Sequence, residues 1–249
     1  VTAATIVPVL FLGYIGYRPF PALLVGGFFL GIAGTSFAVG VPFVNTWFPP
    51  ARRGAAVGIF GMGMGGTAIS ALTTVKLVDH HGIHLPFVIV ALVLAVYAVA
   101  ATLILRDAPS RRRPTESSLV RLGAAMRLAV TWRASALYAV GFGGYVAFSV
   151  YLPTYLRNAY ALTQDNAAMK MAGFVLLAVV LRPVGGWLSD RVAPFAVLAV
   201  SFAVVTICAV VQATTPSLTP VWTVTFLAMA AALGAASGAV FALVAQQAP

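Results

Sequence analysis

Residues 85–105 read LPFVIVALVLAVYAVAATLIL and contain no charged side chain. A helix needs about 20 mostly apolar residues to cross the hydrocarbon core of a bilayer, so this stretch predicts a membrane span. The whole chain shares this character, because 61% of its 249 residues are hydrophobic and only 8% are charged. A soluble domain has about 25% charged residues and could not bury so much apolar surface. We therefore expect an all-α integral membrane protein.

Apolar runs of similar length recur along the chain, separated by residues that end helices. Proline lacks a backbone N–H and interrupts a helix, and it stands in the breaks at Arg18-Pro19, Pro49-Pro50 and Thr215-Pro216. The eight spans that we expect cover residues 1–17, 20–48, 54–78, 84–106, 133–157, 167–188, 194–213 and 219–246.

One of these breaks is rich in histidine. Asp79, His80, His81 and His84 lie close together, but their spacing fits no zinc template well. We expect a polar turn outside the membrane there, and no metal site. Nothing in the sequence resembles a nucleophile elbow, so we expect no catalytic residues, no cofactor and no enzymatic activity.

The net charge of +10 is distributed unevenly between the two sides of the membrane. Loops that carry more Lys and Arg lie in the cytoplasm, and ten basic residues fall on one side against four on the other. The segment 107–132 and both chain ends are then cytoplasmic, and the protein lies in the plasma membrane. No nucleic-acid-binding motif accompanies the charge, so we expect no nucleic-acid partner. The richer side receives Arg52, Arg53, Arg106, Arg111, Arg112, Arg113, Arg121, Arg127, Arg133 and Arg191, and the other receives Arg18, Lys76, Arg157 and Lys170.

The segment 107–132 separates two groups of four spans. It predicts three parts for the chain, which are an N-terminal bundle part (1–106), a cytoplasmic linker (107–132) and a C-terminal bundle part (133–249). Two interpretations of the linker are open, an amphipathic helix at the membrane surface and a solvated connection. The first rests on apolar residues at helical spacing with arginines nearby, namely Leu119, Leu122, Met126, Ala129, Arg121 and Arg127.

The third expected span carries a stripe of glycines. Residues 61–66 match the G-x-G-x-x-G pattern of dinucleotide-binding proteins, but they lie inside an apolar span and not after a strand. Gly54, Gly58, Gly61 and Gly65 instead share one helical face, where glycine lets another backbone approach closely. The stripe serves either helix packing or the lining of a narrow pore.

Arg182 lies inside the sixth span, eight positions before Asp190 and therefore about 12 Å into the helix. A charged residue there costs at least about 2.5–3.5 kcal/mol unless it faces a cavity or a partner. All five acidic residues fall in loops or at helix ends, so no carboxylate is available at that depth. Two interpretations are open. The side chain either extends to the membrane surface, or it binds a planar oxyanion through its forked guanidinium.

Residues 185–191, GGWLSDR, resemble the G-x-x-x-D-R loop motif of the major facilitator superfamily. The segments 29–34 (FLGIAG), 47–54 (WFPPARRG), 142–145 (FGGY), 151–153 (YLP) and 182–186 (RPVGG) are similar to the nitrate/nitrite porters of that superfamily. The resemblance implies that the eight spans correspond to helices 3 to 10 of a twelve-helix fold, as a truncated chain.

The resemblance also implies a function and a site. It implies transport of nitrate and nitrite by alternating access, by exchange or with protons, which truncation would impair. Arg182 would bind the anion, and Tyr138, Phe142, Gly61 and Gly65 would line the substrate-binding site with it. The loop motif, with Gly186, Asp190 and Arg191, would control the conformation.

One departure and two alternatives accompany the resemblance. Met64 stands where the porters usually have an asparagine, and a thioether cannot donate a hydrogen bond to an anion. The alternatives are a transporter of another small organic anion and a degenerate membrane protein that transports nothing.

Overall fold

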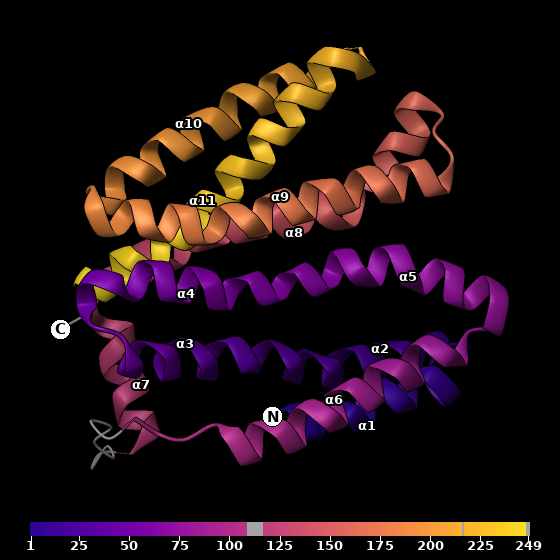
Figure 1. Cartoon of the computed structure of the whole chain (residues 1–249), viewed down its shortest axis with the longest axis horizontal. Coiled ribbons are helices and arrows are strands. Elements are labelled where there is room, and N and C mark those ends of the chain that lie inside the picture. The colour runs from indigo at the N-terminus through magenta and orange to yellow at the C-terminus, as the bar shows by residue number, and fades with distance from the viewer. Residues whose placement is uncertain (109–116, 216, 248–249) are drawn as a thin grey trace. The chain divides into compact units, whose positions relative to one another are not determined.

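The computed structural model describes residues 1–108, 117–215 and 217–247, and these residues form helices joined by short connections (Figure 1). This confirms the expected all-α membrane fold. The α-helices are α1 (Thr2–Phe11), α2 (Phe20–Leu30), α3 (Thr35–Trp47), α4 (Arg53–Gly61), α5 (Gly66–His81), α6 (His84–Ile104), α7 (Ser118–Arg127), α8 (Ala129–Tyr160), α9 (Gln164–Arg191), α10 (Pro194–Ala213) and α11 (Thr223–Gln247).

Seven helical runs in the described part of the chain are long and apolar enough to cross a membrane. They match seven of the eight expected spans, and short 3-10 segments join α2 to α3 and α4 to α5 within them. The remaining expected span, 1–17, is a shorter apolar helix over Thr2–Gly16. The runs are Phe20–Trp47, Pro50–His81, His84–Ile104, Ala129–Tyr160, Gln164–Arg191, Pro194–Ala213 and Leu218–Val244.

The connection around the histidines is shorter than the polar turn expected from the sequence. Asp79, His80 and His81 belong to the last turn of α5, and Gly82, with φ +83°, begins the connection that follows. His84 begins α6, and its Nδ1 lies 2.6 Å from the carbonyl oxygen of Gly13.

The chain divides into two compact units. The first comprises Val1–Phe43 and Ser70–Arg111, and the second comprises Val44–Ile69 and Arg112–Pro249. The second unit therefore includes α4, which precedes the linker in the sequence, because α4 packs on α9 and α11. The three parts predicted from the charge pattern, with boundaries at 106 and 133, remain a prediction.

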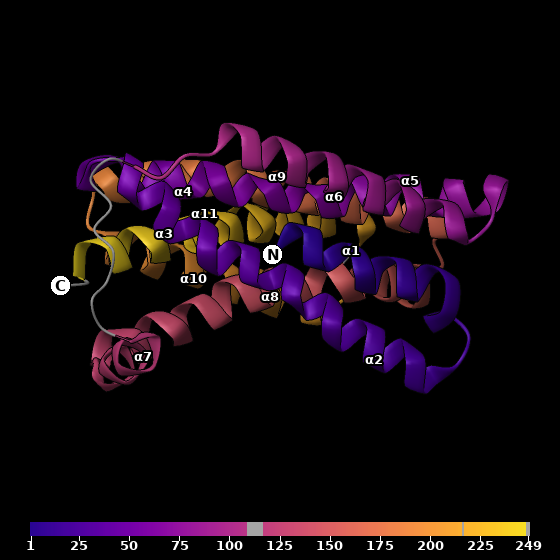
Figure 2. The same cartoon turned by 90° about the horizontal axis from the view of Figure 1, so that it is seen from below.

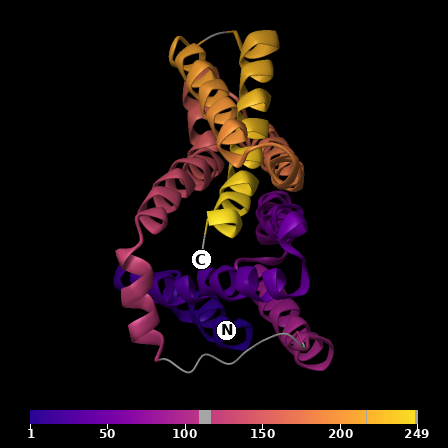
Figure 3. The ribbon, with the colours of Figure 1, turned by 90° about the vertical axis from the view of Figure 1, so that its left-hand side faces the viewer.

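In the second unit α9 and α11 pack closely on each other (Figure 3), and small residues lie at their contact. A side chain at Gly185 would collide with the backbone of Ala235, and one at Gly234 would collide with the carbonyl of Ala178. The backbones of α9 and α11 therefore touch directly, as in many membrane helix pairs. Large apolar side chains fill the space beside this contact, among them Phe174, Leu152, Leu156, Met229 and Leu233.

Candidate functional site

Arg182 is buried in the second unit. α9 has 28 residues, which corresponds to about 42 Å and is longer than the hydrocarbon core of a bilayer. Only 2% of the surface of Arg182 is exposed. A side chain that extended to the membrane surface would expose its charged end, so the burial favours a role inside the protein.

The guanidinium of Arg182 is held by α4 and by two aromatic rings of α8. Its Nη1 donates a hydrogen bond to the carbonyl oxygen of Gly61 at 3.1 Å. Its Cζ lies 5.5 Å from the ring centre of Phe142 and 5.4 Å from that of Tyr145. Aromatic rings at this distance attract a cation, and the attraction increases where water is excluded. These contacts fix the direction of the guanidinium without neutralising its charge.

The second terminal nitrogen, Nη2, is buried and has no hydrogen-bond partner in the described part of the chain. A buried donor without a partner costs about 1–3 kcal/mol, and more when it is charged. Neither α4 nor α8 contains an acidic residue, and those of α9 stand in its first and last turns. The arrangement therefore combines an unneutralised positive charge with a free N–H donor, and an anion would satisfy both.

The other residues expected on α8 lie next to Arg182. The rings of Tyr138 and Phe142 are stacked, with their centres 5.1 Å apart. Tyr138 is near enough to Arg182 for an electrostatic interaction and for a side-chain hydrogen bond. No partner of good hydrogen-bond geometry reaches Nη2 among the described residues. The structure thus brings Arg182, Tyr138 and Phe142 together.

Tyr145 also belongs to this cluster, although it is not among the site residues expected from the sequence. Its hydroxyl lies 3.3 Å from that of Thr67, and only 2% of its surface is exposed. Tyr138, Phe142 and Tyr145 follow one another at intervals of four and three residues, which places them on one face of α8. That spacing is visible in the sequence and could have identified Tyr145.

The two glycines assigned to the site behave differently. A Cβ at Gly61 would lie 3.2 Å from Nη1 of Arg182, whereas one at Gly65 would meet Val179 at an ordinary 3.5 Å. Gly61 therefore belongs to the cluster, and Gly65 contacts the wall of α9 beyond it. Between them, Met64 packs against the apolar core of the unit.

Asp190 forms a second contact between α9 and α4. Its Oδ1 accepts a hydrogen bond from the backbone N–H of Gly54 at 3.1 Å, and its Oδ2 accepts one from Ala55 at 3.0 Å. α4 begins at Arg53, and the side chain of its N-cap residue, Arg52, makes no capping bond. The carboxylate of Asp190 thus caps α4 from another helix, where the helix dipole favours a negative charge.

The other two residues of the loop motif have separate positions. Gly186 lies directly against the carbonyl of Gly54, so a side chain there would push α4 away. Arg191 makes no such contact, and its guanidinium stacks on Trp187 with Cζ 4.1 Å from the ring centre.

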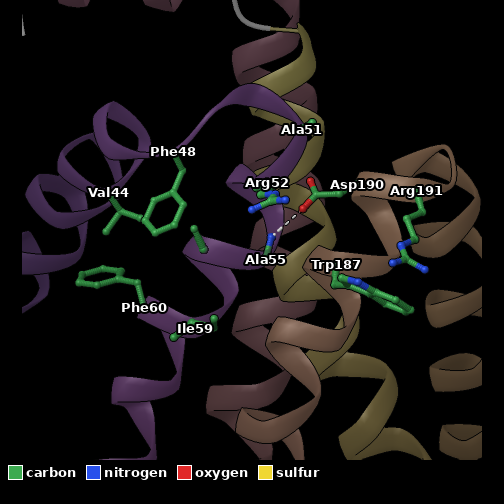
Figure 4. A pocket seen from close by; sticks show the side chains of 11 residues that line it. Val44, Phe48, Ala51, Arg52, Ala55, Ile59, Phe60, Trp187, Asp190 and Arg191 are labelled. Atoms are coloured by element: carbon green, nitrogen blue, oxygen red, sulfur yellow. Dashed lines mark hydrogen bonds between the residues drawn. The ribbon is translucent and has the colours of Figure 1, made fainter. Parts of the chain in front are cut away.

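A half-open cavity of about 640 Å³ lies beside Asp190 (Figure 4). Apolar side chains form most of its wall, with Arg52, Asp190 and Arg191 among them. Arg182 and the aromatic residues of α8 are not part of this wall, so the cavity and the Arg182 cluster are distinct. The lining residues are Val44, Phe48, Ala51, Arg52, Ala55, Ala56, Ile59, Phe60, Trp187, Asp190 and Arg191.

The sequence matches the family model of the Major Facilitator Superfamily over residues 1–249. The chain belongs to this superfamily. It is a multi-pass membrane protein of a transporter family. Membership in a family of transporters, which are not enzymes, confirms the expected class of protein.

Members of this superfamily with similar sequences are named for nitrate or nitrite. The chain is 51% identical to a probable nitrate/nitrite transporter of Mycobacterium tuberculosis, over 100% of this chain and 63% of that protein. It is 32% identical to a nitrite extrusion protein of Bacillus subtilis, over 89% of this chain and 55% of that protein. It is 33% identical to a probable nitrate transporter of Staphylococcus carnosus, over 90% of this chain and 57% of that protein. The chain is thus a homologue of nitrate/nitrite transporters and spans less than two thirds of their length.

Proposed function

We propose that this chain forms part of a transporter that carries nitrate and nitrite across the plasma membrane by alternating access. The free Nη2 of Arg182 is the observation that supports this most directly. Nitrate and nitrite are planar anions, and a guanidinium presents its N–H donors in one plane. The rings of Phe142 and Tyr145 keep water from the guanidinium, which strengthens the attraction for an anion.

The contact between Asp190 and α4 supplies a conformational step in this proposal. The bonds to Gly54 and Ala55 hold one end of α4 against α9. Their rupture would let the two helices separate at that end and open a path to Arg182, and their return would close it. Making and breaking this contact would give the helix pair two discrete arrangements, as a transporter that changes its access requires.

Exchange of nitrate for nitrite fits the residues better than uptake with protons. The four acidic residues that the structure describes lie in helix end turns or in a connection, and none contacts Arg182. A buried carboxylate that could carry a proton beside the anion is therefore absent from the described residues. Proton coupling predicts uptake that increases with a proton gradient alone, and exchange predicts uptake that requires nitrite inside the vesicle.

Substitution of Arg182 by lysine tests the anion site. A suitable protein is a chimera in which these 249 residues replace the matching residues of the M. tuberculosis relative. Lysine keeps the charge but loses the planar fork, and the loss of one charge-assisted hydrogen bond costs about 1.5–3 kcal/mol. The half-saturation concentration for nitrate should increase roughly 10- to 150-fold.

Arg157→Lys is the matched control, because Arg157 is exposed near the end of α8 and should tolerate the same change. Equal half-saturation concentrations for Arg182→Lys and the unsubstituted chimera would reject Arg182 as an anion ligand. Competition by nitrite but not by small carboxylates separates the proposed substrates from other organic anions.

The 249-residue chain alone should give no nitrate flux above empty vesicles, since the resemblance implies six helices in each half of the pathway.

The orientation can be tested independently of transport. The excess of basic residues predicts that Ser117 and both chain ends are cytoplasmic. A cysteine at Ser117, with Cys208 replaced by alanine, should resist an impermeant thiol reagent added outside intact cells. Ready labelling from outside would reverse the proposed topology.

A further inference from the structure

The short helix α7 exposes an apolar face to its surroundings. Leu119 is 80% exposed, Leu122 is 57% exposed and Met126 is 51% exposed, so none of them is covered by the described part of the chain. Their spacing of three and four residues places them on one side of the helix. Ala124 lies on the opposite side. A face of this kind is unfavourable in water and requires an apolar partner.

The join between α7 and α8 is fixed by hydrogen bonds. The hydroxyl of Thr131 donates to the carbonyl of Ala125 at 2.7 Å, and the indole N–H of Trp132 donates to that of Met126 at 2.9 Å. These two carbonyls belong to the last turn of α7, where backbone N–H donors run out. The carbonyl of Ala125 also accepts the backbone N–H of Leu128 at 3.2 Å. The first turn of α8 therefore caps α7, so that α7 is held in a set direction at the start of α8.

That direction is across α8. α7 runs along the vertical in Figure 1, while α8 runs horizontally, and α7 is seen nearly end-on in Figure 2. α8 has 32 residues, or about 48 Å, against a hydrocarbon core of about 30 Å, so a span centred in the bilayer leaves its first turn outside the core. Trp132, which is 61% exposed, is a residue type that favours the boundary between membrane and water. A helix fixed across α8 at this depth lies along the membrane surface.

The charges of α7 complement one kind of membrane surface. Arg121 and Arg127 lie outside the apolar face, and Arg133 follows Trp132 in the first turns of α8. α7 contains no acidic residue. Basic residues beside an apolar helical face bind anionic lipid headgroups while the apolar side chains enter the acyl region.

We propose that α7 is a membrane-surface helix that binds anionic phospholipid at the end of the bilayer where α8 begins. Leu119, Leu122 and Met126 enter the acyl boundary, and Arg121 and Arg127 contact the headgroup phosphates. This resolves the two interpretations of the linker in favour of the amphipathic helix. The proposal does not depend on nitrate as the substrate, but only on α8 crossing the membrane.

Spin labels on the two faces of α7 test the proposal. The 249-residue chain, with Cys208 replaced by alanine, receives a label at Leu122→Cys or at Ala124→Cys and is placed in nanodiscs of phosphatidylcholine with phosphatidylglycerol. At Leu122→Cys, collisions with oxygen should exceed those with a water-soluble nickel chelate several-fold, because oxygen concentrates in acyl chains. At Ala124→Cys the order should be reversed. Both positions are exposed, so the substitutions should leave the fold intact.

The dependence on anionic lipid is the second measurement. Nanodiscs of phosphatidylcholine alone should shift the Leu122→Cys label toward the nickel chelate, and Arg121→Gln with Arg127→Gln should produce the same shift when phosphatidylglycerol is present. Arg157→Gln, near the other end of α8, is the control and should change nothing. Equal access of the nickel chelate to both faces would show a solvated linker and overturn the proposal. Protection of Leu122→Cys from both reagents would show packing against protein, and indifference to phosphatidylglycerol would exclude the headgroup contacts.

Discussion

Arg182 and Asp190 are charged side chains of the same helix, and both contact α4, but their charges are satisfied to different degrees. Each carboxylate oxygen of Asp190 accepts a backbone N–H, and these donors need such a partner because they begin a helix. Arg182 donates Nη1 to Gly61, but its Nη2 finds no partner of good geometry among the described residues, at 2% exposure. The Asp190 contact is complete without a ligand, whereas the Arg182 contact is not.

The difference indicates separate tasks for the two ends of one helix pair. A hydrogen bond to a charged group contributes about 1.5–3 kcal/mol, so the Asp190 contact stabilises the closely packed arrangement of α4 and α9. The same arrangement buries a free donor at Arg182, which an anion would stabilise. Changes at Arg182 should therefore alter affinity, and changes at Asp190 should alter the balance between closed and open arrangements.

The largest effect should be the loss of anion affinity in Arg182→Gln, compared with Asp190→Asn. Arg182→Gln removes both the charge and the fork, and the chimera with the M. tuberculosis relative should lose about 3 kcal/mol of anion binding, or roughly 150-fold in half-saturation concentration. Asp190→Asn should leave that concentration nearly unchanged and alter the maximal rate. Nitrate uptake over a concentration series at matched expression measures both. A large loss of affinity in the Asp190 variant would mean that the two contacts do not have separate tasks.

A smaller effect is expected when only the Asp190 contact is removed. Asp190→Ala leaves the first N–H groups of α4 without their cap, which costs about 2 kcal/mol and shifts the closed arrangement toward the open one roughly 30-fold. A cysteine at Ala56, which is 8% exposed, should then react faster with a thiol reagent in the Cys208→Ala background. Asp165→Ala removes the same charge from the other end of α9, and it should leave the reaction rate of the cysteine at position 56 unchanged. Equal rates for the two alanine variants would contradict a closing role for Asp190.

The sequence predicted the spans and the main residues of both contacts, because these depend on local properties. Hydropathy locates the spans, and an arginine in an apolar helix is conspicuous wherever it points. The partner of Asp190 could not be chosen in this way. A helix N-terminus and an arginine both attract a carboxylate, and only the packing of α4 on α9 selects the first. Similarly, the bond between Thr67 and Tyr145 joins two helices, and no local pattern predicts which hydroxyls meet.

The glycine stripe shows a further limit of the sequence, since its members look alike but have different neighbours. A Cβ at Gly58 would lie 2.7 Å from the backbone of Pro183, whereas a Cβ at Gly61 would face only the side chain of Arg182. A Cβ at Gly63 would meet nothing within 4 Å. Helical periodicity assigns Gly58 and Gly61 to one face, but it does not distinguish a backbone contact from a side-chain contact.

The smallest expected effect uses this difference to test how closely the guanidinium is held. In Gly61→Ala the new methyl group would lie 3.2 Å from Nη1 of Arg182, so the guanidinium must move by a few tenths of an ångström. Such slight overpacking against the end of a side chain costs about 1 kcal/mol, which predicts a roughly fivefold increase in the half-saturation concentration for nitrate. Gly63→Ala is the matched control, because it adds the same methyl group two residues away, where a Cβ would meet nothing within 4 Å. Equal affinities for the two variants would mean that the position of Nη1 does not limit anion binding. In that case the bond to Gly61 would serve only to satisfy one donor, and Nη2 with the aromatic rings would bind the anion.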